Sequence, residues 1–349
     1  MSFSRHRSVV EQHIELEMIC PYEPGKPIWE VKRELGLDTV IKLASNENPA
    51  GPSPRALDML NRSNLELNTY PDYHGWYLRE ALALEFGLPQ GAFVIGAGSS
   101  ELMRLVADVY LGPGTEAMVT DICFPVYANV ARVRGATAVV VPLTPELEYD
   151  LEAMLAAVNE RTRVVFLASP NNPTGRAIPP DDIADFLARL PSRVLCVLDL
   201  AYYEYTRAEL RVDPETLLRR HPNLLMLRTF SKVYGLAGLR VGYAIAASDV
   251  VEALDRVRIP FTTSTAAQVA ARAALADQEH AERSLVLNAA MLKRFYDDMA
   301  ALDLRTVPSE SNFALVDVAC DSDIVFRGLL LRGVIVRPVR APRLNTWLR

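Results

Sequence analysis

Between about Ala92 and about Pro260, the chain alternates short apolar runs with longer amphipathic stretches. Short apolar runs bounded by turn residues are typical of buried strands, and apolar residues spaced by three or four are typical of helices. This pattern predicts strands at Ala117–Asp121, Ala138–Pro142, Val164–Ala168, Val194–Asp199, Leu224–Thr229 and Gly242–Ala246. It predicts helices at Ser99–Tyr110, Leu151–Val158, Pro180–Arg189 and Asp213–Arg219.

Strands that alternate with helices predict right-handed crossovers, and therefore an α/β fold. We expect a large domain whose mostly parallel sheet, of about seven strands, lies between helices. In such sheets ligands bind beyond the carboxyl ends of the strands. The polar residues that follow each strand are therefore the candidates for a functional site.

The pattern changes after about Pro260, and this change predicts a second, smaller α+β domain. A chain of 349 residues is also too long for one hydrophobic core. Helices are predicted at Ala266–Asp277 and Ala281–Leu302, and strand-like segments at Phe313–Val318 and Val334–Arg337. We expect residues 1–50 to form an N-terminal arm and part of the small domain, residues 51–262 the large domain, and residues 263–349 the small domain, which looks short at its end.

Composition and charge exclude several classes of protein. The formal net charge of -6 argues against a nucleic-acid-binding surface, which needs clustered Lys and Arg. No apolar run approaches the roughly 18 residues of a membrane span. Glu11, Glu15 and Glu17 interrupt the start of the chain, which therefore lacks the apolar core of a signal peptide. The four cysteines are widely spaced, which is typical of reduced thiols in a cytoplasmic protein, and no metal site is predicted.

The segment RTFSKVYGLAGLRVGY, residues 228–243, directly follows an apolar strand and contains Lys232. A lysine in such a place is costly to bury as a cation, and burial favours the neutral amine that attacks aldehydes. Thr229, Ser231 and Arg240 supply hydroxyl groups and a fixed cation, a set suited to a phosphate dianion. The alternative is a surface lysine in a turn.

Three further motifs follow or precede predicted elements. Asp199 ends a buried-strand pattern in LDLAYYEY, where an acid is also common as a helix cap or in a solvated turn. In SPNNPTG, residues 169–175, Asn172 is placed to donate to a phenolate oxygen, although the motif also suits a simple tight turn. GAGSSE, residues 96–101, is weak as a dinucleotide fingerprint. A phosphate at the N-terminus of the following helix is the better interpretation.

Together with NENPAGPSP, these motifs resemble those of fold-type-I pyridoxal-phosphate (PLP) aminotransferases. The resemblance runs from about Pro21 to the last residue. It is specifically to the histidinol-phosphate aminotransferase family, which also includes aromatic aminotransferases. Five motifs in the family's order and spacing make it a strong resemblance.

The resemblance implies a role for each matching residue. Lys232 would carry the cofactor and move a proton at the substrate Cα, and Asp199 would pair with the pyridinium nitrogen. Asn172 and Tyr202 would bind the phenolate oxygen. The phosphate would be held by Ser99, Ser100, Ser231 and Arg240, with Thr229 as a further contact.

The remaining implied residues lie around the ring, at the subunit interface and on the substrate side. Tyr127, in FPVY, matches the aromatic residue that stacks on the ring. Tyr70, in TYPD, matches a tyrosine that reaches a phosphate across a dimer interface, which implies a homodimer. Either tyrosine is otherwise an ordinary core or turn residue. The substrate-side residues are Tyr22, Asn46, Arg337 and Arg349.

The chain departs from the family at two places. Val233 stands where the family has a small residue, which we expect to affect packing rather than chemistry. Relatives continue for about one more strand and helix beyond NTWLR, and Arg349 falls where the family binds the substrate α-carboxylate. A terminal arginine frays unless it is tied down, so carboxylate binding by Arg337, or by neither arginine, is the alternative.

The resemblance implies an aminotransferase that takes glutamate as donor. The expected acceptor is imidazole-acetol phosphate, giving L-histidinol phosphate in histidine biosynthesis. An aromatic 2-oxo acid is the close alternative. Two others are a PLP-dependent decarboxylase of a phosphorylated amino acid and a non-catalytic binding protein with the same fold.

Overall fold

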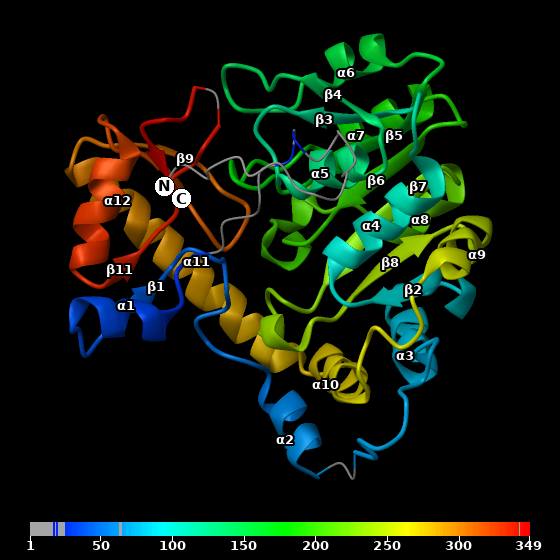
Figure 1. Cartoon of the computed structure of the whole chain (residues 1–349), viewed down its shortest axis with the longest axis horizontal. Coiled ribbons are helices and arrows are strands. Elements are labelled where there is room, and N and C mark those ends of the chain that lie inside the picture. Colours follow the sequence, from blue (N-terminus) through cyan, green and yellow to red (C-terminus); the bar gives the residue numbers. More distant parts are fainter. Residues whose placement is uncertain (1–16, 18, 20–24, 63–64, 342) are drawn as a thin grey trace, which may run out of the picture.

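The computed structural model describes residues 17, 19, 25–62, 65–341 and 343–349, and within them a seven-stranded sheet forms the centre of the molecule (Figure 1). The strand order is β2, β8, β7, β6, β5, β3, β4, and only β8 runs antiparallel to its neighbours. The strands are β2 (Phe93–Gly96), β3 (Glu116–Thr120), β4 (Thr137–Val141), β5 (Thr162–Ala168), β6 (Leu195–Asp199), β7 (Leu224–Thr229) and β8 (Gly242–Ala246). The expected α/β fold with a mostly parallel sheet is confirmed.

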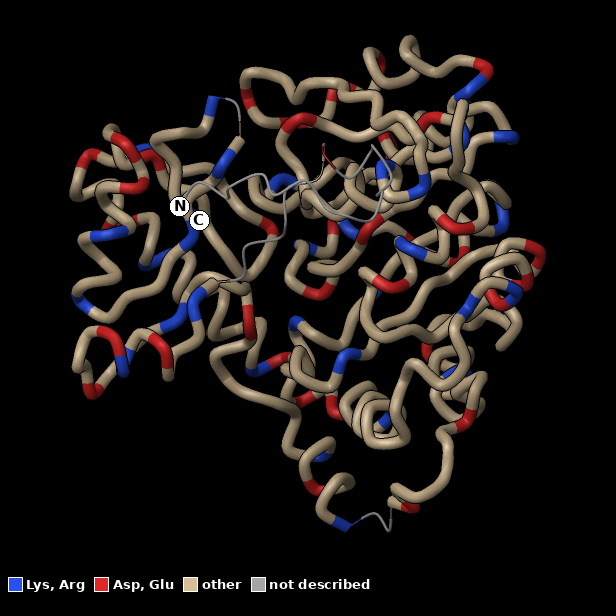
Figure 2. The backbone as a smooth tube through the Cα atoms, viewed as in Figure 1, with Lys and Arg blue, Asp and Glu red and all other residues tan. Residues whose placement is uncertain are grey.

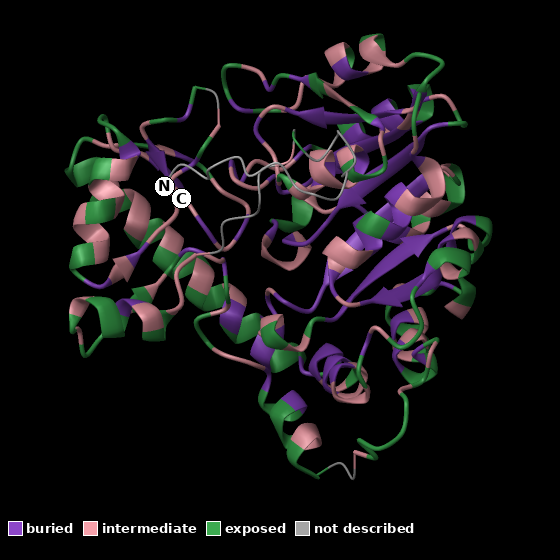
Figure 3. Cartoon of the chain, viewed as in Figure 1, coloured by how far each residue is buried: buried purple, intermediate pink, exposed green. Residues whose placement is uncertain are grey.

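Helices cover both faces of this sheet, and its strands are largely buried except for the edge strand β4 (Figure 3). One core contains Phe186, Cys196 and Met226, and the other contains Leu102, Val197 and Leu225. The helices around them are α2 (Pro54–Arg62), α3 (Trp76–Phe86), α4 (Ser99–Tyr110), α5 (Val126–Val133), α6 (Leu151–Ala157), α7 (Pro180–Arg189), α8 (Pro214–Arg220), α9 (Ser248–Val257) and α10 (Thr265–Leu275). Short 3₁₀ turns lie at Gln90–Ala92, Tyr203–Tyr205, Ala208–Leu210 and Ala237–Leu239.

A smaller group of elements lies beside the sheet and combines the two ends of the described chain (Figure 1). Its elements are α1 (Ile28–Leu35), β1 (Ile41–Lys42), α11 (Gln278–Ala301), β9 (Arg305–Val307), β10 (Leu315–Asp317), α12 (Ser322–Leu331), β11 (Val334–Ile335) and β12 (Trp347–Leu348). The early strand β1 pairs in parallel with β11, and β10 pairs antiparallel with both β9 and β12.

The division between residues 262 and 263 stays a prediction, but the packing of α10 favours a later boundary. Ala267, Ala270, Ala271 and Ala274 on α10 are buried in the same core as the sheet. Helix α10 packs against α2 and α3, because its small side chains allow a close approach. We therefore favour a boundary within α11.

Lys and Arg are interspersed with Asp and Glu along the described chain (Figure 2). Basic and acidic residues alternate on the outer helices, many of them as ion pairs four residues apart. Among the described residues, no helix is both long enough and apolar enough to cross a membrane.

A buried ion pair joins β7 to the segment that follows β6. The Arg228 guanidinium is 3% exposed, and its Nη2 lies 2.6 Å from Oε1 of Glu204. It also stacks over the ring of Tyr203 at 4.0 Å. Since side chains alternate along a strand, Arg228 points to the face opposite Thr229. The pair therefore anchors one face of β7. Thr229, on the opposite face, lines the cavity described below.

We expect Glu204→Gln to lower the free energy of unfolding by about 3–5 kcal/mol, because it leaves the Arg228 charge buried without its counter-ion. Urea unfolding measures this change. Glu215→Gln is the matched control, since Glu215 pairs with Arg219 on the exposed face of α8. That pair is worth about 0.5 kcal/mol or less. Equal losses in the two variants would contradict the role of the buried pair.

Candidate active site

A cavity of about 240 Å³ lies at the carboxyl ends of β5, β6 and β7. Parallel strands end at the same edge of a sheet, so polar residues after successive strands meet there. Twelve of the residues expected from the sequence line this cavity: Asn46, Ser99, Ser100, Tyr127, Asn172, Asp199, Tyr202, Thr229, Ser231, Lys232, Arg240 and Arg349. The sequence motifs therefore identified residues that the fold brings together.

Asp199 is the last residue of β6 and is 6% exposed. Its Oδ2 accepts a hydrogen bond from the Tyr127 hydroxyl at 2.7 Å, and its Oδ1 accepts one from the Ala201 N–H at 3.0 Å. Burial raises the pKa of this carboxyl, while the two hydrogen bonds and the nearby Lys232 cation oppose that rise. A cationic N–H group in the cavity is thus a favourable partner for the Asp199 carboxylate.

Lys232 lies at the cavity wall, between β7 and the N-terminal segment. Its Nζ donates to the carbonyl oxygens of Ser45 at 3.3 Å and Asn46 at 3.2 Å, and lies 5.4 Å from the centre of the Tyr202 ring. Both acceptors are neutral carbonyl oxygens, so these two hydrogen bonds do not neutralise a charge on the amine. The Tyr202 hydroxyl accepts a hydrogen bond from Asn46 Nδ2 at 2.9 Å.

The other end of the cavity is built to receive an anion. Helix α4 begins at Ser99, and its first N–H groups lack partners within the helix. Gly98 precedes it with φ +85°, and a Cβ atom there would lie 2.5 Å from Arg240 Nη2. Arg240 Nη1 donates to Ser231 Oγ at 3.4 Å, and the Ser231 N–H donates to Thr229 Oγ1 at 3.1 Å.

Two residues of the cavity have left-handed backbone that is uncommon for side chains other than glycine. Arg240 has φ +55° and Asn46 has φ +54°. Such backbone costs roughly 1–3 kcal/mol and persists where the surrounding structure holds it. Asn46 Oδ1 is also buried without a hydrogen-bond partner in the structure. Both observations are typical of residues that are held in place for a ligand.

Arg349 is held by hydrogen bonds from both its backbone and its side chain. Its N–H donates to the Arg337 carbonyl at 2.8 Å, next to the β10–β12 pairing. Its Nη1 donates to Asn172 Oδ1 at 2.7 Å, and its Nη2 donates to the Ala44 carbonyl at 2.6 Å. The guanidinium therefore lies in the cavity, between the SPNNPTG turn and the N-terminal segment.

Tyr127 and Phe124 occupy different environments although one turn carries both. Tyr127 is 1% exposed and stacks on Phe166 with 5.1 Å between ring centres. Phe124 is only half-buried, and it too lines the cavity. The sequence analysis did not single out Phe124. Its signal was an aromatic residue three positions before Tyr127 in CFPVY.

The remaining expected residues lie away from the cavity lining or outside the described chain. Tyr70 is 81% exposed and stacks on Phe261 at 4.6 Å. Arg337 is not a lining residue, although its backbone pairs with Arg349. Tyr22 lies outside the described residues.

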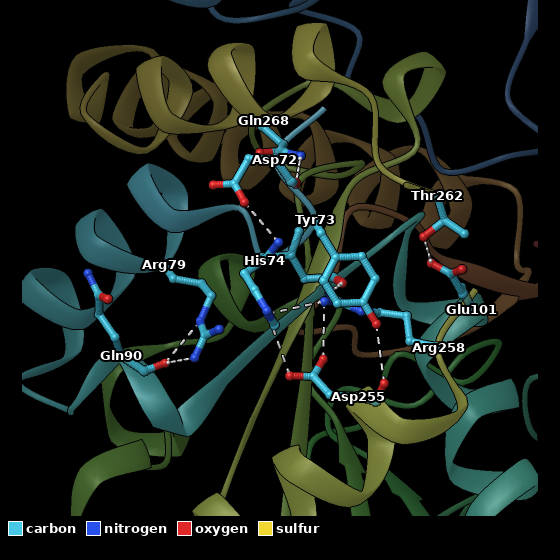
Figure 4. A network of polar contacts seen from close by, with 11 residues as sticks. Asp72, Tyr73, His74, Arg79, Gln90, Glu101, Asp255, Arg258, Thr262 and Gln268 are labelled. Atoms are coloured by element: carbon cyan, nitrogen blue, oxygen red, sulfur yellow. Dashed lines mark hydrogen bonds and ion pairs between the residues drawn. The ribbon is translucent and has the colours of Figure 1, made fainter. Parts of the chain in front are cut away.

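The loop that carries Tyr70 is fixed by a cluster of polar contacts around Arg258 (Figure 4). The Arg258 guanidinium lies 4.1 Å from the centre of the Tyr73 ring and pairs with Asp255 at 3.2 Å. Gln268 Nε2 donates to the Asp72 carbonyl at 2.9 Å. Tyr70 is therefore an exposed side chain on a loop that polar contacts hold in place.

Comparison with known proteins identifies the family of this chain. Residues 38–349 match the family model for aminotransferase class I and II. The chain is 46% identical to the histidinol-phosphate aminotransferase of Moorella thermoacetica, over 95% of this chain and 86% of that protein. It is 43% identical to that of Caldicellulosiruptor saccharolyticus, over 96% and 93%.

A solved structure is also similar to this chain over nearly its whole length. The crystal structure of the Sinorhizobium meliloti histidinol-phosphate aminotransferase, in complex with pyridoxal-5'-phosphate, superposes with a TM-score of 0.89. It is 30% identical, and the match covers 98% of this chain and 93% of that one. The chain therefore belongs to the class I and II aminotransferases, and within them to the histidinol-phosphate aminotransferase family that its motifs resemble.

Proposed function

We propose that this protein is a PLP-dependent histidinol-phosphate aminotransferase, which interconverts L-histidinol phosphate and 2-oxoglutarate with imidazole-acetol phosphate and L-glutamate. The observation that carries this proposal is that one cavity combines an amine, Lys232, a buried carboxylate, Asp199, and an arginine beside a helix N-terminus, Arg240. Relatives named for this reaction share over 40% of its residues across nearly its whole length.

The residues present fit PLP. The cavity has groups that favour an anion at the α4 end and a buried carboxylate at the β6 end. Asn46 Oδ1 is buried there without a hydrogen-bond partner. When bound, PLP provides an electron-accepting ring that allows the Cα–H bond of an amino substrate to break. Lys232 Nζ would hold the cofactor and then move the proton released from Cα.

The other side chains bind and orient. Asp199 would accept the ring N–H, and Tyr202 would donate to the phenolate oxygen. Because Asn172 Oδ1 already accepts from Arg349, the Asn172 amide presents its NH₂ group as a second donor. Ser99, Ser100, Thr229, Ser231 and Arg240 would hold the phosphate. We propose that the half-exposed Phe124, rather than the buried Tyr127, lies against the ring.

We also propose a homodimer. Tyr70 is exposed, lies outside its own chain's cavity lining and is held on an anchored loop, as a residue that reaches a partner subunit's phosphate would be. Arg349 would bind the carboxylate of the amino donor, and Asn46 would lie on the substrate side. Tyr22 and Arg337 stay predictions, as does a cytoplasmic location.

An acceptor panel tests the reaction directly. With glutamate as donor, we expect imidazole-acetol phosphate to give a kcat/KM at least about tenfold above that of phenylpyruvate, which corresponds to about 1.4 kcal/mol of transition-state binding. The readout is 2-oxoglutarate formation. A preference for phenylpyruvate would favour the aromatic aminotransferase. Release of carbon dioxide from phosphorylated amino acids would favour the decarboxylase.

We expect Lys232→Ala to abolish transamination while the protein still folds. No other group can form the covalent link, and the amine makes only two long hydrogen bonds to carbonyl oxygens. Borohydride reduction and peptide mapping should place the cofactor on Lys232, and circular dichroism checks the fold. Lys293→Ala on the exposed face of α11 is the control and should retain activity. An adduct on another lysine would remove Lys232 from the mechanism.

We expect Arg349→Ala to raise KM for glutamate roughly ten- to a hundredfold, since a guanidinium–carboxylate pair is worth on the order of 1.5–3 kcal/mol. Cofactor retention should hardly change. Steady-state kinetics measures the first quantity and the absorbance of bound PLP the second. The control is Arg294→Ala, at an exposed position of α11. An unchanged KM in Arg349→Ala would mean that another group binds the carboxylate.

A further inference from the structure

One turn places two aromatic side chains, those of Phe124 and Tyr127, in different environments. The Tyr127 N–H donates to the Phe124 carbonyl at 3.2 Å, so the two residues belong to one tight turn at the start of α5. Both residues line the cavity, but Phe124 is half-buried, whereas the Tyr127 ring is buried and lies nearly parallel to that of Phe166, at 10°. The Tyr127 ring is thus fixed by the core, and its hydroxyl is the part that serves the site.

That hydroxyl completes the environment of Asp199. One oxygen of the carboxylate accepts from Tyr127 and the other from the Ala201 N–H. A donor on each oxygen sets the rotation of the carboxylate plane, because turning it would break both bonds. Removing the hydroxyl would leave one oxygen without its side-chain donor in a buried position.

We propose that Tyr127 is a positioning residue whose hydroxyl keeps Asp199 charged and turned toward the ring nitrogen of PLP. This inference rests on the proposed function, because it assigns Tyr127 a task only if PLP occupies the cavity. Tyr127 acts through Asp199 and does not touch the reacting atoms.

The ionisation of the pair has a definite direction. Burial, then the Asp199 charge, raises the pKa of Tyr127 well above its ordinary value, so the phenol stays protonated and donates. The charged and titratable groups that face the pair are Lys232 toward Asp199, and Tyr149 and Cys123 toward Tyr127. Burial raises the pKa of Asp199 and the Tyr127 bond lowers it, so losing the hydroxyl raises it further. The carboxylate then loses its charge at a higher pH.

Tyr127→Phe tests the proposal, because phenylalanine keeps the ring on Phe166 and deletes only the hydroxyl. The probe is PLP, titrated by absorbance into the full chain freed of cofactor, between about pH 6 and about pH 9. We expect the dissociation constant to rise roughly tenfold near neutral pH, since a hydrogen bond to a charged group is lost. The rise should grow as pH falls, because Asp199 of the variant protonates first.

Two further variants distinguish a positioning role of the Tyr127 hydroxyl from a general loosening of the core. In an Asp199→Asn background, Tyr127→Phe should change the dissociation constant less than about twofold, because the charge it serves is already gone. Tyr149→Phe is the matched control: its buried hydroxyl accepts from Ala168 N–H and donates to Asn171, and it does not contact Asp199. It should leave the pH dependence of PLP binding unchanged.

The possible outcomes distinguish the proposed function from the positioning role of Tyr127. Failure of the unchanged protein to bind PLP overturns the proposed function itself. Normal binding with no change in Tyr127→Phe overturns only the positioning role. An equal shift in Tyr149→Phe, or a full tenfold effect that persists beside Asp199→Asn, also overturns it, because the effect would then come from the loosened core.

Discussion

The structure depends on one constraint: neighbouring parallel strands end at the same edge of the sheet, and their side chains alternate. The register pairs Ala168 with Asp199 and Asp199 with Leu227, so β5, β6 and β7 stop nearly level. A period of two then puts Asp199 on the face of Leu195 and Val197, and Thr229 on the face of Leu225 and Leu227. Polar groups of the cavity gather beyond that edge, and the backbone pairing of the sheet places them.

The sheet alone leaves the cavity open, and both ends of the described chain help to close it. The segment before Asn48 supplies Ser45 and Asn46, and the last residue supplies Arg349. Arg349 reaches across to the Ala44 carbonyl, so the two ends bind each other at the wall of the cavity. Parallel pairing of β1 with β11 supports the same contact. The smaller group of elements therefore contributes to the site as well as to stability.

Local patterns were enough to predict much of this. The bounds of β7, β8, α4 and α7 agree with the observed ones, because each combines a clear periodicity with a turn residue at its edge. Helix α5 was not predicted: its stretch is short, follows a proline and contains three valines, which favour strands. The motifs located the cavity residues, since those residues follow strands at recognisable spacings.

Two features of the site could not be predicted from local sequence patterns, because each depends on contacts between residues far apart in the chain. Phe124 and Tyr127 both line the cavity, and the different burial of their rings depends on the turn before α5 and on Phe166, which is far away in sequence. The anchoring of Arg349 depends on β12 pairing with β10, and a terminal residue carries no local signal of such pairing.

The placement of charge follows from the same geometry. β7 carries a buried cation, Arg228, on one face, and it is neutralised by Glu204 and surrounded by aromatic rings. Past the strand ends, Lys232 Nζ donates to two carbonyl oxygens and lies over the Tyr202 ring, and Asp199 accepts hydrogen bonds from Tyr127 and the Ala201 N–H. A buried charge is costly unless it is paired. The protein gives the buried Arg228 cation a carboxylate partner, whereas the amine and the carboxylate of the cavity, Lys232 and Asp199, do not form an ion pair with hydrogen-bond contact. The paired structural charge therefore lies on one face of β7, and the groups of the cavity lie beyond the ends of β6 and β7.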